Sequence, residues 1–462
     1  DVNMSQRIRR RDVLRGIGVT GVVGLAGCGG NGDGGDGDDT TTPSDGGDGD
    51  GDGMDTTTTA ADGGDGDDTT TTAGDGDGDG GAAGRTIRLG MAMGVTGGLE
   101  SLGPPIRDAA QVVPTQVNDA DTDFEVDVQF EDTGTNPSQG VSGAESLVNA
   151  GYPMICGALS SEVSLQIATN VAVPSGTTMC SPASTAPDFT TLEDDDYFFR
   201  TPPTDALQGA VLARIASERL GHDSAATLYL NNTYGNGLSA GFVDSFENDF
   251  GGTVTNSVSF SKGQSSYSSQ LQSALGDDPG VLLVVGYPES GVQIFRDFYN
   301  GFDGDMDVLV SDGLQSNDLP GSVGFDMSNV TGTAPSGEGP GLDFFLEEFE
   351  NQYGESIEGQ PFTKQAYDAA AALVLANAAA GENDGQSVRD NMRAVTGEGG
   401  TEVTPENLVE GIEMAAAGEE INYQGVSGPV AFDENGDLAS AAYVYFGYTS
   451  DGGMETLDTI TP

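Results

Sequence analysis

Two hydrophobic periods alternate along residues 85–462 of this 462-residue chain. Short apolar or alternating runs, such as TIRLGMAM at 86–93 and GVLLVVGY at 280–287, have the pattern of half-buried or fully buried strands. Between these runs, apolar residues recur at helical spacing, as they do over 138–150. A regular succession of strands and helices predicts an α/β fold in which parallel sheets are covered by helices.

The same pattern assigns the individual elements. We expect strands at 86–93, 124–132, 153–160, 224–230, 252–260, 280–287 and 306–313. We expect helices at 105–119, 138–150, 161–171, 235–250, 267–275, 289–300, 341–353, 362–380 and 404–416. Pro114 should kink its helix, because proline lacks a backbone N–H. The last segment, 427–448, is expected to be a strand pair with a turn at ENGD, 434–437. Two runs of strands and helices, separated near 200–203, predict two lobes.

Residues 29–84 have a different composition from the rest of the chain. Gly, Asp and Thr make up nearly all of this segment, and Met54 is its only large apolar residue. Such a segment cannot bury enough apolar surface to offset the entropy lost on ordering. We therefore expect 29–84 to be a disordered linker.

The first 28 residues have the order of features found in export signals. Arg10 and Arg11 precede the apolar stretch 17–26, which is too short to span a bilayer. The stretch ends in LAGC at Cys28, and the whole resembles a twin-arginine-like signal peptide with a lipobox. This resemblance implies that Cys28 carries a lipid. It also implies a protein held on the extracellular face of the cell membrane after twin-arginine export.

The charge balance is strongly acidic. The chain has 16 Lys+Arg against 74 Asp+Glu, for a net charge of −58, and only two lysines, Lys262 and Lys364. Nucleic acid is excluded as a partner, since phosphate binding needs a basic surface. An excess of acid with so little lysine resembles proteins of extreme halophiles, where high salt screens the self-repulsion.

The sequence offers little for catalysis. Its single histidine, His222, lies between a helix and a strand, which excludes histidine-based triads and His-rich zinc sites. GLSAG at 237–241 matches a nucleophile motif only in its letters, because it lies at the start of a helix. We expect no enzyme activity, no cofactor and no metal.

Small and hydroxyl residues instead gather where predicted strands end, which is where open α/β sheets bind ligands. These segments are GVTGGLESLG, GALSSEV, CSPASTAPDF, NNTYGNG, YPESG and SDG. Each alone is ordinary turn and cap chemistry. Their repetition around two predicted sheets favours a small-molecule site between two lobes.

Several stretches carry a resemblance to a known family. SPASTAPDFT…YFFRTPPTDALQGA is similar to a signature of the periplasmic leucine/isoleucine/valine-binding proteins of branched-chain amino acid ABC transporters. NNTYGNGLS, VVGYPESGVQIFRDF, AYDAAAAL and GPVAFDENGDL match further landmarks of that family in the same order. The resemblance covers nearly all of 85–462. It implies a type I periplasmic-binding-protein fold, with three crossings between the lobes near 201–205, 331–336 and 424–428.

The resemblance also implies the division of the chain. Lobe 1 would comprise 85–203 plus 335–425, and lobe 2 would comprise 204–334 plus 426–462. The protein would be a monomer that closes on its ligand and then docks on the permease of an ABC importer.

Ligand-binding residues follow from the resemblance one position at a time. The family's carboxylate-binding serine falls on Ser161, with Ser160 as a close alternative. The acidic residue that receives the ammonium falls on Asp312, where the family has Glu, and the family's tryptophan position falls on Leu102. The remaining implied contacts are Ala183, Thr185, Tyr234 and Tyr287. An amide, urea or carboxylate ligand, and a ligand-sensing ectodomain, stay open as alternatives.

Cys156 and Cys180 end two strands that should be neighbours in the first sheet. We expect the two side chains to lie close together. A disulfide and a pair of free thiols both remain open, since bridges between adjacent strands are often strained.

Overall fold

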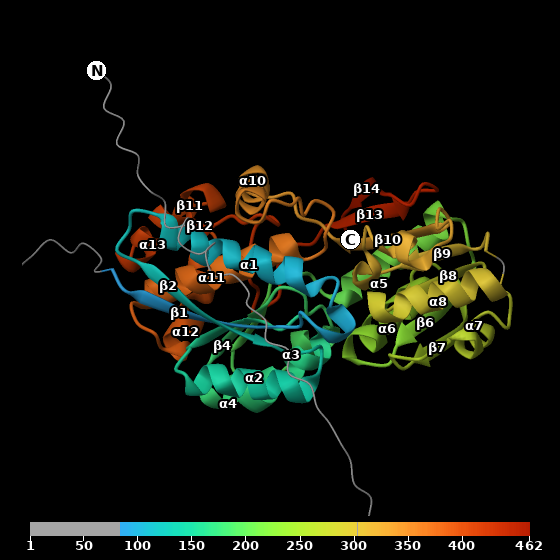
Figure 1. Cartoon of the computed structure of the whole chain (residues 1–462), viewed down its shortest axis with the longest axis horizontal. Coiled ribbons are helices and arrows are strands. Elements are labelled where there is room, and N and C mark those ends of the chain that lie inside the picture. The colour runs from blue at the N-terminus through green and yellow to red at the C-terminus, as the bar shows by residue number, and fades with distance from the viewer. Residues whose placement is uncertain (1–83, 303) are drawn as a thin grey trace, which may run out of the picture. The chain divides into compact units, whose positions relative to one another are not determined.

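The computed structural model describes residues 84–302 and 304–462 (Figure 1). The predicted signal peptide 1–28, the lipidation site Cys28 and nearly all of the predicted linker 29–84 lie outside the described residues. The described chain contains two main sheets.

The first sheet has five parallel strands in the order β2-β1-β3-β4-β5. They are β1 (Thr86–Met93), β2 (Glu125–Asp132), β3 (Met154–Gly157), β4 (Thr178–Ser181) and β5 (Phe198–Arg200). The connecting helices are α1 (Gly103–Asp119), α2 (Pro137–Asn149), α3 (Ser161–Ile167) and the short α4 (Val173–Ser175). β1, β3 and β4 are almost wholly buried, as expected for central parallel strands covered on both faces.

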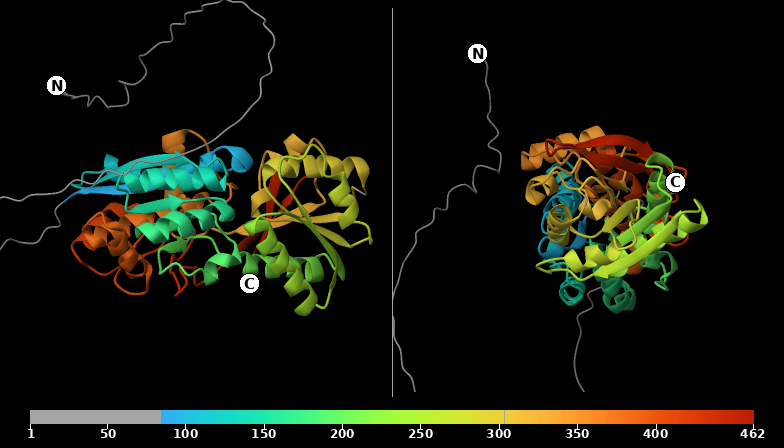
Figure 2. Two further views of the ribbon diagram at one scale, coloured as in Figure 1. Left: turned by 90° about the horizontal axis from the view of Figure 1, so that it is seen from below. Right: turned by 90° about the vertical axis from the view of Figure 1, so that its right-hand side faces the viewer.

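The second sheet has seven strands in the order β14-β13-β10-β9-β8-β6-β7. They are β6 (Ser224–Leu230), β7 (Thr253–Phe260), β8 (Val281–Val285), β9 (Asp307–Val310), β10 (Val330–Pro335), β13 (Tyr443–Tyr448) and β14 (Met454–Ile460). All pairs are parallel except β10–β13 and β13–β14. The helices are α5 (Asp205–Arg214), α6 (Thr233–Asn248), α7 (Ser268–Ala274), α8 (Pro288–Gly301) and α9 (Leu319–Val323). Figure 2 shows this sheet between green and yellow helices.

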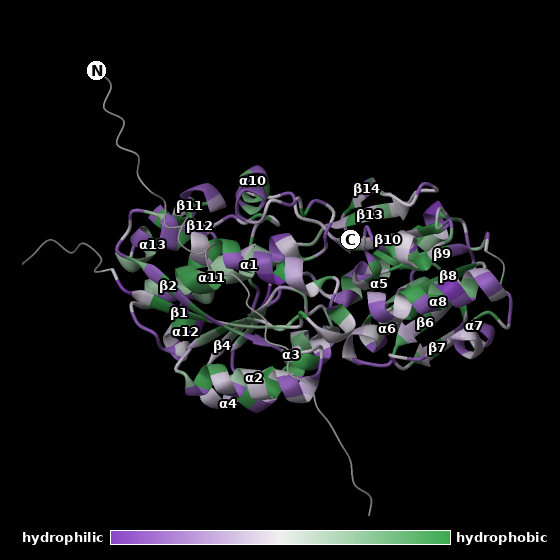
Figure 3. Cartoon of the chain, viewed as in Figure 1, coloured by the Kyte–Doolittle hydropathy of each residue, from purple (hydrophilic) through white to green (hydrophobic). Residues whose placement is uncertain are grey.

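The segment after β10 returns to the first sheet. It contains α10 (Leu342–Tyr353), α11 (Thr363–Ala380), α12 (Gly385–Thr396), α13 (Leu408–Ala416) and a small parallel pair, β11 (Thr401–Val403) with β12 (Ile421–Tyr423). α11 is largely apolar (Figure 3), packs against α1 and the first sheet, and is buried over most of its length. We call the first sheet with its helices the first lobe, and the second sheet with its helices the second lobe.

The predicted α/β class and the two parallel-sheet lobes are confirmed. Pro114 lies inside α1, which continues past it, and the expected kink stays a prediction. Among the described residues, no helix is long and apolar enough to cross a lipid bilayer.

The predicted strand pair within 427–448 is wrong. The turn at 434–437 exists, with Phe432 bridging Leu438, but no strand precedes it, and β13 pairs with β10 and β14 instead. The reason is a tie to the first sheet, where the amide of Arg200 in β5 donates to the carbonyl of Gly436 at 3.0 Å. A segment held at β5 cannot also continue the second sheet.

The same hydrogen bond, from Arg200 to Gly436, also changes where the third crossing between the lobes is found. Residues 432–438 contact β5, so the chain passes to the second lobe at 439–442 and not near 424–428. The predicted assignment of all of 426–462 to lobe 2 therefore does not match these contacts. The remaining lobe boundaries stay a prediction about which segments move together.

Cys156 and Cys180 are direct partners in the register of β3 and β4, which confirms that they are neighbours. Both are free and buried, so the bridge that the sequence left open is not formed. Side chains of paired residues on parallel strands point the same way, which keeps their Cβ atoms near the ~4.8 Å strand spacing. A disulfide needs about 3.8 Å between Cβ atoms. Burial also raises the pKa of both thiols, which leaves them unreactive.

We expect peptides containing Cys156 and Cys180 to be alkylated after denaturation without reductant, and neither to react in the folded protein. Mass spectrometry of the digested, labelled protein measures this. A peptide pair linked through sulfur in the unreduced sample would contradict the expectation.

Candidate ligand-binding site

Loops at the carboxyl ends of strands in both sheets meet around one cavity. Its wall comes from the loop after β1, the start of α3, the loop after β4, the starts of α6 and α8, and the turn after β9. The lining residues are Leu99, Leu102, Ile106, Leu159, Ser161, Ala183, Tyr234, Tyr287, Asp312, Gly313 and Phe362. The cavity volume is ≈ 20 Å³, which is room for about one water molecule.

Six of the eight residues predicted for the site line this cavity, and the other two lie beside it. The six are Leu102, Ser161, Ala183, Tyr234, Tyr287 and Asp312. Of the two serines, Ser161 lies in the wall, while Ser160 accepts a hydrogen bond from the Tyr287 hydroxyl at 3.3 Å. Thr185 is buried, and its hydroxyl lies next to Asp205, whose pKa it lowers through a side-chain hydrogen bond.

The serines of the loop after β4 hold the loop together. Ser181 Oγ donates to the carbonyl of Ala158 at 2.6 Å and accepts from the amide of Ser184 at 3.0 Å. Ser184 Oγ donates to Ser164 Oγ at 2.7 Å, and Ser161 Oγ accepts from the amide of Ala186 at 3.3 Å. These hydroxyls fix the loop to α3 and to the loop after β3. The loop therefore presents its backbone, together with the side chains of Ala183 and Thr185.

Two tyrosines form the second-lobe wall. The rings of Tyr234 and Tyr287 stack with centroids 5.6 Å apart at an interplanar angle of 3°. The Tyr234 hydroxyl shares a 2.7 Å hydrogen bond with Ser311 Oγ and donates to Asp312 Oδ2 at 3.3 Å. Burial, and then the neighbouring carboxylates, raises the pKa of Tyr234, so its phenol stays neutral.

A second carboxylate lies behind the wall. Asp205 opens α5, and its amide donates to the carbonyl of Thr185 at 2.8 Å. Within the described chain, Gln208 Oε1 and Asp312 Oδ1 are buried without a hydrogen-bond partner, and the Asp205 oxygens have only the neighbouring Thr185 hydroxyl. Sequence reasoning missed Asp205 and Gln208, although both lie in TDALQGA, the end of the stretch that resembles the family signature. No local signal shows that this helix start would be buried beside Asp312.

The two carboxylates raise each other's cost of ionisation. Burial raises the pKa of Asp312 to about 6, although side-chain hydrogen bonds, first with Gln208 and also with Tyr234, oppose the rise. Burial, and then the charge of Asp312, raises the pKa of Asp205 well above its ordinary value. Two buried carboxyl groups so close together cannot both be ionised cheaply unless a cation joins them.

The rest of the wall is apolar. Leu99, Ile106, Leu159 and Phe362 join the predicted Leu102, and sequence reasoning missed these four. Phe362 comes from the segment before α11, with a φ of 62° that few bulky residues adopt. Its place in the site depends on the return of the chain to the first lobe, which no local pattern shows.

Other chemistry is not evident in the described residues. They contain no group of three or more His, Cys, Asp or Glu placed to hold a metal ion. His222 Nε2 lies 2.7 Å from Asp307 Oδ2, at the opposite end of the second sheet from the cavity-lining loops.

Comparison with known proteins adds to this geometry. Residues 86–453 match the profile of the periplasmic binding protein family. The chain is 26% identical over 393 residues to the chemotactic signal transduction system substrate-binding protein BasB of Halobacterium salinarum, covering 82% of this chain and 90% of that protein.

Solved structures show the same fold. A leucine-binding protein from Thermotoga maritima superposes with a TM-score of 0.68 at 24% identity, covering 81% of this chain and 99% of that one. A solute-binding protein from Rhodopseudomonas palustris in complex with 3,4-dihydroxybenzoic acid gives a TM-score of 0.64 at 19% identity, covering 81% and 97%. With strands, cavity and profile in agreement, this chain belongs to the periplasmic binding protein family, with the type I fold and the branched-chain amino acid binding proteins among its relatives.

Proposed function

We propose that this protein captures an amino acid with an apolar side chain, of the branched-chain type, between its two lobes. The observation that carries the proposal is the buried pair Asp205 and Asp312, with unpartnered oxygens next to an apolar cavity. Among the described residues, Arg200 offsets only part of the charge of Asp205, and the ammonium group of an amino acid would supply a cation directly at the pair.

An ammonium group fits this end of the cavity. It offers three N–H donors, and hydrogen bonds to ionised carboxylates are about twice as strong as neutral ones. The unpartnered acceptor in the wall is Asp312 Oδ1, and the Asp205 carboxylate, which has only the Thr185 hydroxyl beside it, lies behind the wall. Binding would thus relieve a cost that the ligand-free protein carries.

Other ligand classes fit this end less well. An aromatic acid, like the dihydroxybenzoic acid bound by the Rhodopseudomonas relative, would bring a third negative charge toward the pair. A neutral amide or urea would donate hydrogen bonds but leave the charges unbalanced. The leucine-binding relative from Thermotoga supports the choice of an amino acid.

The carboxylate and the side chain of the ligand would also find matching groups in the cavity wall. Ser161 stands at the first-lobe side of the cavity and offers a hydroxyl to the ligand carboxylate. The side chain would lie among Leu99, Leu102 and Ile106. Burying a leucine side chain contributes roughly 1.5–3 kcal/mol.

Ligand capture requires the lobes to move. The ≈ 20 Å³ cavity is too small for an amino acid, and the lobes touch directly through Tyr287–Ser160 and through Lys262 Nζ, which donates to the Thr135 carbonyl at 3.2 Å. An opened form would admit the ligand. A closed form that contacts the ligand from both lobes would then be favoured.

The proposal for how the ligand reaches an ABC permease depends on the sequence before residue 84. We propose that Cys28 carries a lipid after twin-arginine export, which would hold a monomer at the extracellular face of the membrane beside an ABC permease. The ligand would leave chemically unchanged.

The name of the Halobacterium relative favours a second candidate, in which ligand occupancy is reported to a chemotaxis partner. Leucine uptake and leucine chemotaxis, measured in a strain lacking this protein, separate the two.

A thermal unfolding screen in molar salt tests the ligand class. We expect leucine, isoleucine or valine to raise the melting temperature, since ligand at 100 times its Kd stabilises by about 2.7 kcal/mol. Asp312→Asn should weaken binding at least tenfold, whereas Asp244→Asn, at an exposed aspartate of α6, should not. A shift with benzoate or an amide, and none with any amino acid, would refute the proposal.

The acid pair also predicts a pH dependence of the ligand-free protein. Asp312 holds its proton to about pH 6 when folded but only to about 4 when unfolded, so its ionisation costs stability as pH rises through this window. Relative to wild type, Asp312→Asn should gain roughly 1–3 kcal/mol of unfolding free energy between pH 4 and pH 7. Denaturant unfolding at several pH values measures this, and a variant that loses relative stability with rising pH would contradict it.

A further inference from the structure

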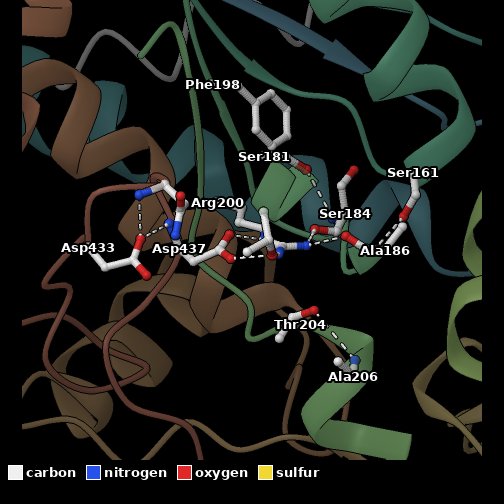
Figure 4. A network of polar contacts seen from close by, with 12 residues as sticks. Ser161, Ser181, Ser184, Ala186, Phe198, Arg200, Thr204, Ala206, Asp433 and Asp437 are labelled. Atoms are coloured by element: carbon white, nitrogen blue, oxygen red, sulfur yellow. Dashed lines mark hydrogen bonds and ion pairs between the residues drawn. The ribbon is translucent and has the colours of Figure 1, made fainter. Parts of the chain in front are cut away.

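The buried guanidinium of Arg200 joins β5, the loop after β4 and the 434–437 turn (Figure 4). Arg200, the last residue of β5, is fully buried. Its Nη1 donates to the carbonyls of Ala186 at 2.7 Å and Ser184 at 3.4 Å, and its Nη2 donates to Thr190 Oγ1 at 3.0 Å. Its Nε donates to Asp437 Oδ1, while Thr190 Oγ1 donates to Asp437 Oδ2 at 2.6 Å.

The Asp437 side of this network is itself fixed. The 434–437 turn is closed by Asp433, whose Oδ1 accepts from the amide of Asp437 at 3.0 Å. Arg393 Nε donates to the carbonyl of Asp433 at 2.7 Å, and the amide of Arg200 donates to the carbonyl of Gly436. The turn therefore forms a fixed support directly before the crossing into β13.

The loop on the other side is held at 181–186 by the hydroxyls described above, but its carbonyls need donors as well. Residues 182–190 contain two prolines and mostly small side chains, and the large apolar side chain that they bury is Phe189, which stacks on Phe198 of β5 with ring centroids 4.3 Å apart. The carbonyls of Ser184 and Ala186 flank Thr185, and buried carbonyls need donors. The planar fork of arginine supplies several donors in a fixed geometry, which lysine cannot do.

We propose that Arg200, Thr190 and Asp437 form a clamp that positions residues 183–186 for the ligand. None of the three lines the cavity, so the clamp acts through the loop and does not touch the ligand. The ligand in this proposal is the amino acid of the proposed function. The ENGD turn, which the sequence suggested as a hairpin, thereby gains a role in the site.

Because a buried ion pair stabilises only when its hydrogen bonds are complete, loss of one member should loosen the whole clamp. Thr190 offers the mildest test, since it is half-buried at the rim of the network. Thr190→Val keeps its shape but removes the bridging hydroxyl. Thr190→Ser retains the hydroxyl and serves as the matched control. Arg200→Lys keeps the charge but loses the fork.

Two measurements on the full chain in molar salt decide the proposal. The first is hydrogen exchange of residues 183–190 without ligand, with 281–285 in β8 as an internal reference. The second is the Kd for leucine by calorimetry. We expect Thr190→Val to speed exchange in the loop about tenfold and to raise the Kd about fivefold, with β8 unchanged. Thr190→Ser should match wild type, and a folded Arg200→Lys should resemble or exceed Thr190→Val.

Equal exchange in Thr190→Val and Thr190→Ser would overturn the clamp. Faster exchange with an unchanged Kd would overturn its positioning role. If wild-type protein does not bind leucine, the proposed function fails. The exchange comparison, which needs no ligand, then decides the clamp by itself.

Discussion

Asp205, at the start of α5, and Asp312, in the turn after β9, are both buried, and the charge of Asp312 acts on Asp205. Within the described chain, neither has a full set of hydrogen-bond partners. Ionising both carboxyl groups in such a place is costly. When both are protonated, their acceptor oxygens stay without full hydrogen-bond partners. The other features of the site follow this constraint. Neutral tyrosines border the pair, apolar residues fill the rest of the wall, and the small loop after β4 brings its backbone close.

The constraint has a particular meaning in a chain with 16 Lys+Arg against 74 Asp+Glu. Most acidic residues can face solvent, where salt screens them. The guanidinium of Arg200 donates its hydrogen bonds to the loop after β4 and to Asp437. It only partly offsets the charge of Asp205, whose pKa stays raised by burial and by Asp312. We propose that the ammonium group of the ligand supplies the positive charge that Asp205 and Asp312 need.

Much of the fold could be predicted from the sequence, because its strands and helices differ sharply in hydrophobic period. The cavity-lining residues Ser161, Tyr234 and Tyr287 were found through resemblance, since local sequence marks only a strand end. Features set by long-range packing were missed or misplaced. Asp205 becomes a site residue only when α5 packs beside the turn after β9, and the ENGD turn leaves the predicted hairpin only because β5 holds it.

The central claim is that the pair receives a cation, and proton exchange on binding tests it most directly. Leucine can be titrated calorimetrically near pH 6 in molar salt, in two buffers of different ionisation enthalpy. Asp312 is about half protonated there, so an entering ammonium should release roughly half a proton or more per leucine. Leucine binding with no release, or with proton uptake as an anion would require, would contradict the account.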